Sequence, residues 1–428
     1  MNRRRIGLVM AMEEELAQAE ATNPMTTLDD AEGSAETSML EAGEMSAEVD
    51  AQMDEVALTE DSTDELTALA DVMQKTTENG GMDETTAEVI EVAVEGIYAR
   101  MGVRGRAKMP AMESFGNKAT RLQVTMEAIA DIKAFVAKAW KAILDAIVGA
   151  SEAIMSFFKK LVDGNARMLG RAKSYKDQAG KLTSDESETK TIASGSFGKA
   201  LAIDGKVSGS VVVSGVAAVV VALNKAGEKA AKAGEMAGSV GSEPAGIDLG
   251  MGASVGSADG FDEAPEGMAV TRSAELPGGF AFVSQFTAGG KMTAEQIKAT
   301  MVMVGRFKPK AEAVEIGEVA TLTKAEMIKV ADEVIALSEA VTKNKEAADK
   351  LYNARKELVA KVKALMNKPA DDATKAGQAL ASSFNKLSKV FMMDFAKYSV
   401  GTGLQALNYV QKSMEQFKVA PKLKQIAA

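Results

Sequence analysis

The most regular hydrophobic pattern in the chain lies near its end, where apolar residues recur at alternating intervals of three and four. This seam covers residues 327–365 and is broken only at Asn344 and Arg355. The preceding Thr323-Lys-Ala-Glu326 has the form of a capping box, so the pattern predicts a helix over residues 323–367. Such a seam either packs within the molecule or pairs two subunits, and both interpretations are open from the sequence.

A second helical pattern follows the seam after a short connector around Pro369. Its apolar positions fall on one face of a helix: Leu380, Phe384, Leu387, Phe391 and Phe395. Because a short connector usually joins neighbouring helices antiparallel, residues 323–428 are predicted to form an antiparallel helical hairpin.

Residues 114–182 also show helical spacing, from Leu122 to Leu169. Gly149 falls inside this pattern and is expected to interrupt the helix, since glycine is a poor helix former. We therefore predict a helical segment made of more than one piece.

Residues 183–322 mix helical and strand patterns. The most apolar stretch, residues 207–223, is short for a membrane span and runs on into a polar helix, which favours a buried helix over a membrane helix. Residues 278–286 alternate as a strand does, and residues 299–307 are expected to pair with it across a helical insert that begins near Thr293. Gly, Ala, Ser and Asp dominate residues 234–280, for which we expect a long flexible loop.

The N-terminal residues carry the weakest hydrophobic pattern. Residues 17–60 contain no aromatic side chain and are expected to be largely disordered, because they offer little apolar surface to offset the entropy of ordering. Short helices are predicted at residues 64–76 and 85–101, separated by Asn79-Gly80-Gly81. Such a pair is too small to be a stable domain and is interpreted as a docking element. The apolar run at residues 6–12 meets three glutamates at once and is rejected as an export signal.

Together these patterns predict a mainly α fold in four segments. They are an acidic, partly disordered segment 1–113, a helical segment 114–182, a mixed α/β segment 183–322 that supplies a small β element in the middle, and the helical hairpin 323–428.

Composition removes several kinds of chemistry. The 428 residues include no histidine and no cysteine, which excludes Ser-His-Asp triads, thiol nucleophiles, disulfides and Cys/His zinc sites. The sequence also shows no phosphate-binding loop, nucleophile elbow or paired-acid arrangement. We therefore expect no enzyme activity, no cofactor and no metal site.

Charge is distributed unevenly along the chain. Residues 1–113 contain 26 acidic and 8 basic residues, a formal charge of −18, whereas the remainder of the chain carries +8 and the whole chain −10. An acidic disordered tail on a globular body is the simplest interpretation. A segment that is removed at some stage is the alternative.

The charge changes sign at an exposed connector that contains Pro110 and Gly116. Proline and glycine keep such a stretch out of a helix, and exposed connectors are where proteases cut. Within it, Ala111-Met112-Glu113 followed by Ser114 presents a small residue, any residue and a carboxylate. An extended peptide of this kind can lie on a protease as an added strand and be recognised at Ala111 and Glu113.

These residues resemble the internal head (inner body) proteins of giant phiKZ-like bacteriophages, strongly over residues 60–120 and by composition elsewhere. The resemblance implies an acidic propeptide that the prohead protease removes by cutting after Glu113, so that Ser114 begins the mature chain. Other small-X-Glu tripeptides end at Glu36 and Glu48, where the propeptide would be cut as it is degraded. Further matches lie near residues 235–275, where a second cut is open.

Basic residues cluster in the second half of the predicted helical segment, where residues 114–182 carry a net charge of +6. The candidates for contact with DNA phosphate are Lys159, Lys160, Arg167, Arg171, Lys173 and Lys176. A solvated helix face is the competing interpretation. Because no aromatic residues are interleaved with the charges, any DNA contact is expected to be non-specific.

The resulting functional expectation is a non-enzymatic virion structural protein that lies inside the capsid and occupies the host cytoplasm during assembly. Its expected partners are the prohead protease, other head proteins and the packaged DNA, with no membrane. The alternative is a coiled-coil scaffolding or adaptor protein that keeps its acidic arm. The sequence leaves the oligomeric state open.

Overall fold

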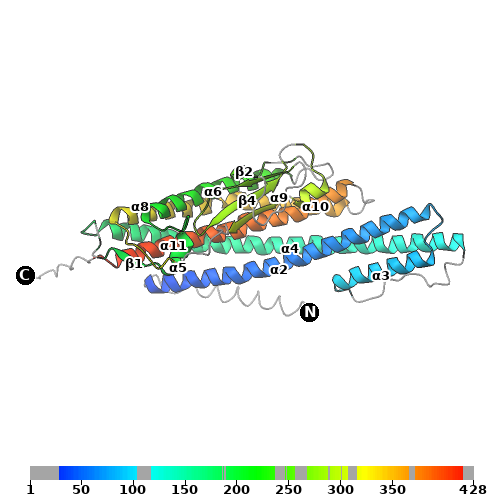
Figure 1. Ribbon diagram of the computed structural model, residues 1–428, viewed down its shortest axis with the longest axis horizontal. Helices are drawn as coiled ribbons and strands as arrows, with labels where there is room; N and C mark the ends of the chain where they lie inside the picture. The colour runs from blue at the N-terminus through cyan, green and yellow to red at the C-terminus, as the bar shows by residue number, and fades with distance from the viewer. Residues whose placement is uncertain are drawn as a thin grey trace, which may run out of the picture.

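The computed structural model shows an elongated, mainly helical molecule, as the sequence predicts (Figure 1). The structure describes residues 28–103, 117–185, 187, 189–236, 246, 248–255, 268–287, 290–299, 301–306, 316–365 and 372–417. We call residues 28–103 the arm and the described residues from 117 to 417 the body.

Helix α4 (Lys118–Gly180) is the longest helix of the described chain, with 63 residues and a length of about 95 Å. It begins at Asn117, whose side chain accepts a hydrogen bond of 2.9 Å from the backbone N–H of Thr120. The predicted interruption at Gly149 is wrong, because α4 passes through it without a break. Glycine costs about 1 kcal/mol in a helix, and the buried Ile147 and Ala150 on either side supply packing that offsets this.

The arm consists of two helices that lie along α4. Helix α2 (Leu28–Thr77) has 50 residues and α3 (Glu84–Arg100) has 17, and the turn between them contains Gly80 and Gly81, both with positive φ. The expected disorder of residues 17–60 is therefore wrong for the part from residue 28 onward, which belongs to α2. Local composition fails here because it leaves out tertiary packing: from Val49 onward, α2 buries side chains against the body.

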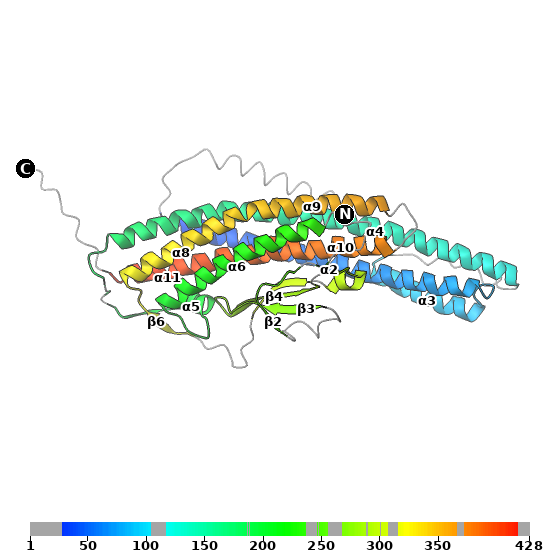
Figure 2. The same ribbon diagram turned by 90° about the horizontal axis from the view of Figure 1, so that it is seen from above.

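The body contains the predicted antiparallel hairpin (Figure 2). One side is formed by α8 (Lys324–Lys343) and α9 (Lys345–Leu365), and the other by α10 (Asp372–Lys389), the π-helical turn η3 (Val390–Asp394) and α11 (Phe395–Met414). The capping box at Thr323 is confirmed, and the helix predicted as continuous divides at Asn344. Seam residues such as Val334 and Leu351 are fully buried in the core, so the seam packs within the molecule.

The short helix α5 (Gly195–Leu201) and the 28-residue helix α6 (Gly209–Met236) follow α4 in the chain. Helix α6 packs on α8 and α9, and its residues Val212, Val216 and Val219 are fully buried in the shared core. In the described part of the chain, Gly209–Glu235 is long and apolar enough to cross a membrane. Its apolar 18-residue window has a mean hydropathy of 1.7, and 44% of that window is buried inside the molecule. This burial agrees with the predicted core helix.

The β element consists of two small antiparallel sheets. Strand β1 (Thr191–Ala193) pairs with β6 (Glu318–Ala320), and a four-stranded sheet has the order β2 (Ala253–Val255), β3 (Ala269–Arg272), β4 (Phe280–Phe286), β5 (Met301–Arg306). The predicted strand and its partner across α7 (Ala294–Ala299) are confirmed. The expected loop over residues 234–280 is wrong for β2 and β3, while residues 237–245 and 256–267 lie outside the described part.

The main core lies where α4, α6 and the hairpin meet, and β4 closes one side of it. The ring of Phe282 on β4 stacks on Phe391 at 5.6 Å and meets Phe395 edge-on at 4.9 Å. Arg355, which interrupts the seam, is 1% exposed and donates a hydrogen bond of 2.9 Å to Asn385 Oδ1. Loss of solvation lowers the pKa of Arg355 to about 10.

Candidate functional site: the interface between arm and body

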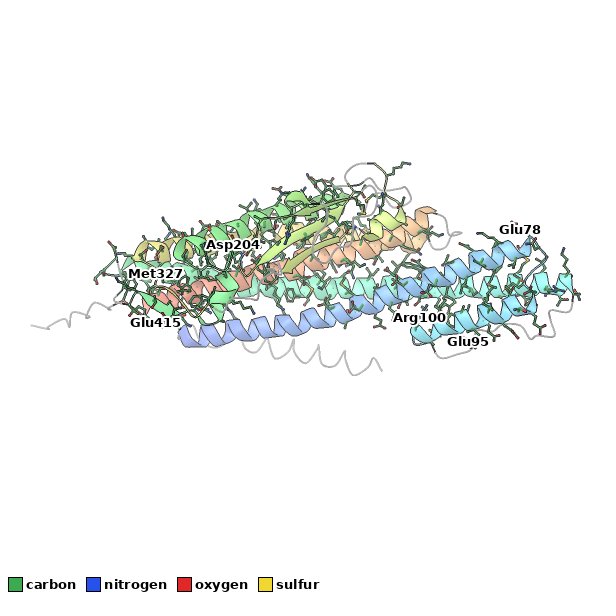
Figure 3. The ribbon with its side chains drawn as sticks, viewed as in Figure 1. Glu78, Glu95, Arg100, Asp204, Met327 and Glu415 are labelled. Carbon is green, nitrogen blue, oxygen red and sulfur yellow. The ribbon has the colours of Figure 1, made fainter. Side chains whose placement is uncertain are left out.

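The arm and the first turns of α4 share a hydrophobic cluster of their own at one end of the molecule, which we call the end cluster. Its buried members are Leu66, Ala70, Met73, Met82, Ile90, Val94 and Ile97 from the arm and Ala128, Ile129 and Ile132 from α4. The rings of Tyr98 and Phe135 pack beside it at a centroid distance of 4.3 Å. Figure 3 places the labelled Glu78, Glu95 and Arg100 at this end, far from Asp204, Met327 and Glu415 of the body.

The turn between α2 and α3 is fitted closely to α4. The backbone N–H of Met82 donates a hydrogen bond of 2.9 Å to the Thr125 hydroxyl. Gly81 has φ +93°, and a Cβ at this position would lie 2.6 Å from the backbone of Arg121. A side chain at residue 81 would therefore push the turn away from the helix.

The middle of α2 enters the main core of the body. Val49 is 1% exposed and Val56 is 7% exposed, and both belong to the same cluster as Trp140 and Ile147 of α4. Further along α2, the buried Glu60 accepts a hydrogen bond of 2.9 Å from the Ser382 hydroxyl of α10.

An ion-pair group joins α2 to the end of α10. The Lys389 ammonium lies 2.6 Å from the Asp50 carboxylate of the arm and 3.0 Å from Asp394. Burial lowers the pKa of Lys389, but its bonds to the two carboxylates outweigh this effect and the pKa lies above its usual value. Burial raises the pKa of Asp394.

Analysis of the sequence missed the part of this interface upstream of residue 64. Val49, Met53 and Val56 recur at intervals of four and three, which is the available signal. The next positions of the same face are Glu60 and Thr63. Because both are polar, the helical hydrophobic spacing cannot be followed past Val56 in the sequence. Both are buried in the structure.

The predicted cleavage residues Ala111, Met112, Glu113 and Ser114 lie outside the described residues. The described chain ends at Val103 on the arm side of this connector and resumes at Asn117. Among the other small-X-Glu matches, Glu36 and Glu48 belong to α2 and Glu235 belongs to α6. A helical backbone does not present the extended peptide that strand addition to a protease requires.

The six predicted DNA-contacting cations are not equivalent in the structure. Lys159, Lys160, Arg167 and Lys173 are exposed on α4, and Lys176 forms an ion pair of 2.6 Å with Asp332. Arg171 differs from the other five in being buried, with 8% of its surface exposed. Its guanidinium lies 3.3 Å from the Tyr175 hydroxyl and 3.4 Å from Gln411 Oε1, so it joins α4 to α11.

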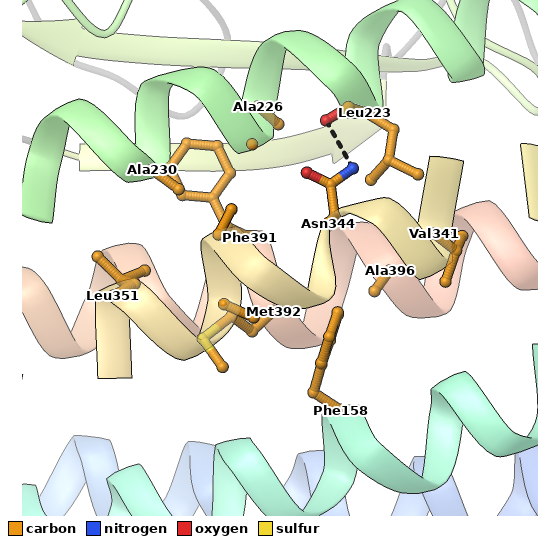
Figure 4. A pocket seen from close by; sticks show the side chains of 13 residues that line it. Phe158, Leu223, Ala226, Ala230, Val341, Asn344, Leu351, Phe391, Met392 and Ala396 are labelled. Atoms are coloured by element: carbon orange, nitrogen blue, oxygen red, sulfur yellow. Dashed lines mark hydrogen bonds between the residues drawn. The ribbon is translucent and has the colours of Figure 1, made fainter. Parts of the chain in front are cut away.

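A small cavity lies beside the break between α8 and α9 (Figure 4). Its volume is about 20 Å³, and its lining is apolar apart from Asn344, whose side chain donates to the Leu223 carbonyl at 3.3 Å. A space of this size accommodates at most a water molecule. Within the described part of the chain, no group of three or more acidic residues is arranged to hold a metal ion.

The fold and this interface define the class of protein: an elongated helical structural protein whose acidic N-terminal arm is packed into a body of opposite charge. The chain belongs to the phiKZ-like phage internal head proteins, whose family profile matches residues 18–412. It is thus a structural protein inside the phage capsid that associates with other head proteins. No curated protein and no solved structure matches the chain.

Proposed function

We propose that the chain is made as an acidic precursor that the prohead protease cuts after Glu113, leaving a basic mature protein packed with the genome. The observation that carries this proposal is the reversal of charge at the connector, from −18 before residue 114 to +8 after it. Loss of the acidic part removes its repulsion from phosphate and frees volume for DNA. Proteolysis makes the change irreversible.

The arm would serve during assembly in the host cytoplasm by contacting other head proteins. The outward face of α3 exposes Val89 by 65% and Val92 by 71%, next to the exposed Glu88. Single apolar residues on a surface are common, but Val89 and Val92 lie on the same face of one helix and would form a contact site for another protein. The neighbouring Glu88 carboxylate would favour a basic partner.

The test of the cleavage is the variant Glu113→Gln in particles. Loss of the carboxylate is expected to leave uncut precursor, detected by N-terminal peptide mapping of protein from purified heads. Glu235→Gln is the matched control, because Glu235 ends another small-X-Glu tripeptide but lies in α6. A normal mature N-terminus at Ser114 in the Glu113→Gln particles would refute the assignment.

The second candidate is a scaffolding protein that keeps its arm. The observation that favours it is the burial of Val49 and Glu60 of the arm against the body. Peptide mapping of wild-type particles separates the two candidates. Arm peptides joined to body peptides across residue 113 identify the scaffold, and chains that start at Ser114 identify the cleaved precursor.

A further inference from the structure

We propose that the arm remains bound to the body after the connector is cut, so that cleavage converts one chain into a two-chain complex. In this complex the faces of α4 and α10 form a binding surface whose partner is the arm. The biological use of this surface rests on the proposed cleavage, but the physical claim holds for any cut within residues 104–116.

The described contacts that hold the arm lie in two regions, one at the end where α2 meets α3 and one in the middle of α2, and neither region includes residues 104–116. At one end, seven buried arm side chains fill the end cluster with three residues of α4. In the middle of α2, Val49 and Val56 are buried in the main core, and Glu60 accepts a hydrogen bond from the Ser382 hydroxyl. Two separate contact regions also fix the direction in which α2 lies on the body.

The covalent link between arm and body gives the arm a high local concentration at its binding surface. Such a link is equivalent to a partner at millimolar concentration, so cutting it converts an intramolecular contact into ordinary association and leaves the contacts described above in place. The buried apolar side chains continue to exclude water from the same surfaces after the cut. Departure of the arm would expose Ala128, Ile129 and Ile132 of α4 to solvent.

Release of the arm therefore requires a second event. The tripeptides that end at Glu36 and Glu48 lie within α2, and Glu48 directly precedes Val49, which is 1% exposed. A protease that binds extended peptides reaches these sites only after α2 unwinds locally. The order of events is then a cut in the connector, local opening of α2, and further cuts that free the arm.

The opposite charges of the two chains are a secondary contribution to this complex. The Asp50–Lys389 pair crosses the interface, together with the hydrogen bonds of Glu60 and Met82, but the two clusters that the arm shares with the body consist of apolar side chains. Salt screens exposed charges and does not weaken apolar burial. The complex is accordingly expected to persist at high ionic strength.

The experiment places the recognition sequence of a site-specific protease within residues 104–116 of the full chain. The purified protein is cut and passed over a size-exclusion column at low and at about 1 M salt, where the Debye length is about 3 Å. Co-elution of arm and body at both salt concentrations is the expected result. Elution of the arm as a separate peak overturns the proposal.

A pair of neighbouring substitutions tests the surface. Ile90 is 4% exposed and belongs to the end cluster, whereas Val89 is 65% exposed. After the cut, Ile90→Asp is expected to release the arm, with an affinity reduced at least 10-fold, and Val89→Asp to leave it bound. Retention of the arm in Ile90→Asp would refute this assignment of the surface, and circular dichroism before the cut shows whether that variant is folded. Because the cut is engineered, failure of natural cleavage at Glu113 leaves this result unaffected.

Discussion

At the scale of single residues, the fit of the arm depends on a position without a side chain. Gly81→Ala is expected to destabilise the docked arm by about 1–3 kcal/mol, because φ +93° is unfavourable for alanine and the added Cβ meets the Arg121 backbone. Urea unfolding followed by circular dichroism measures the change.

Gly96 provides the matched control for this substitution. It lies within α3 on the exposed side, and a Cβ added there meets nothing within 4 Å. Gly96→Ala is therefore expected to be neutral or to stabilise α3 by up to about 1 kcal/mol. Equal effects of the two substitutions would contradict the described contact between the turn and α4.

Individual polar residues also explain where reasoning from the sequence failed. Glu60 and Arg355 both occupy positions of a hydrophobic seam and both are buried. The regular seam around Arg355 is long enough for the helix to be predicted despite it. Around Glu60 the apolar positions are too few, so the same kind of exception left the part of α2 before residue 64 unpredicted. The partners, Ser382 and Asn385, are distant in sequence and could not be inferred from spacing.

At the scale of elements, α3 has an inner and an outer face with different predicted roles. The double variant Val89→Ser/Val92→Ser is expected to change stability by no more than about 0.5 kcal/mol, because both side chains are exposed. If the outer face contacts other head proteins, the variant enters heads several-fold less efficiently than wild type. Quantitative mass spectrometry of purified heads measures this.

Ile90→Ser is the corresponding change on the inner face. Removal of a buried apolar side chain and insertion of a hydroxyl into the end cluster are expected to cost about 2–4 kcal/mol. Its unfolding midpoint should fall while that of the outer-face variant does not. If the Val89→Ser/Val92→Ser variant enters heads as efficiently as wild type, the outer face of α3 does not contact other head proteins.

Elements with strong local signals were predicted well, and elements stabilised by distant contacts were not. The capping box at Thr323, the apolar core of α6 and the alternation in β4 are local signals, and each is confirmed. Helix α2 and the continuity of α4 through Gly149 depend on packing between segments far apart in sequence. The cleavage residues around Glu113 stay a prediction, since they lie outside the described part of the chain.

At the scale of the whole molecule, charge and packing divide the chain at different places. Charge changes sign at the connector, but the main core contains Val49 of the arm together with residues from α4, α6 and the hairpin. The chain is thus divided sharply by charge but not by packing. This arrangement fits a segment that folds with the body and is separated from it later. Under the proposed cleavage, the −18 charge of residues 1–113 would stay with the body until the arm departs.

This reasoning leads to a prediction for DNA binding. The full chain, with a net charge of −10, is expected to bind duplex DNA weakly. The chain that the proposed cleavage would leave, residues 114–428 with +8, is expected to bind more tightly and without sequence preference. Each phosphate contact contributes about 0.9 to the slope of log affinity against log salt, so Lys159→Gln/Lys160→Gln/Lys173→Gln should lower that slope by up to about 2.7. Fluorescence anisotropy with duplexes of unrelated sequence, titrated with salt, measures both quantities.

The control replaces the exposed Lys345, Lys350 and Lys361 of α9 and causes the same change in net charge. An equal loss in both triple variants would assign binding to overall charge, and salt-insensitive binding would exclude phosphate contact by α4.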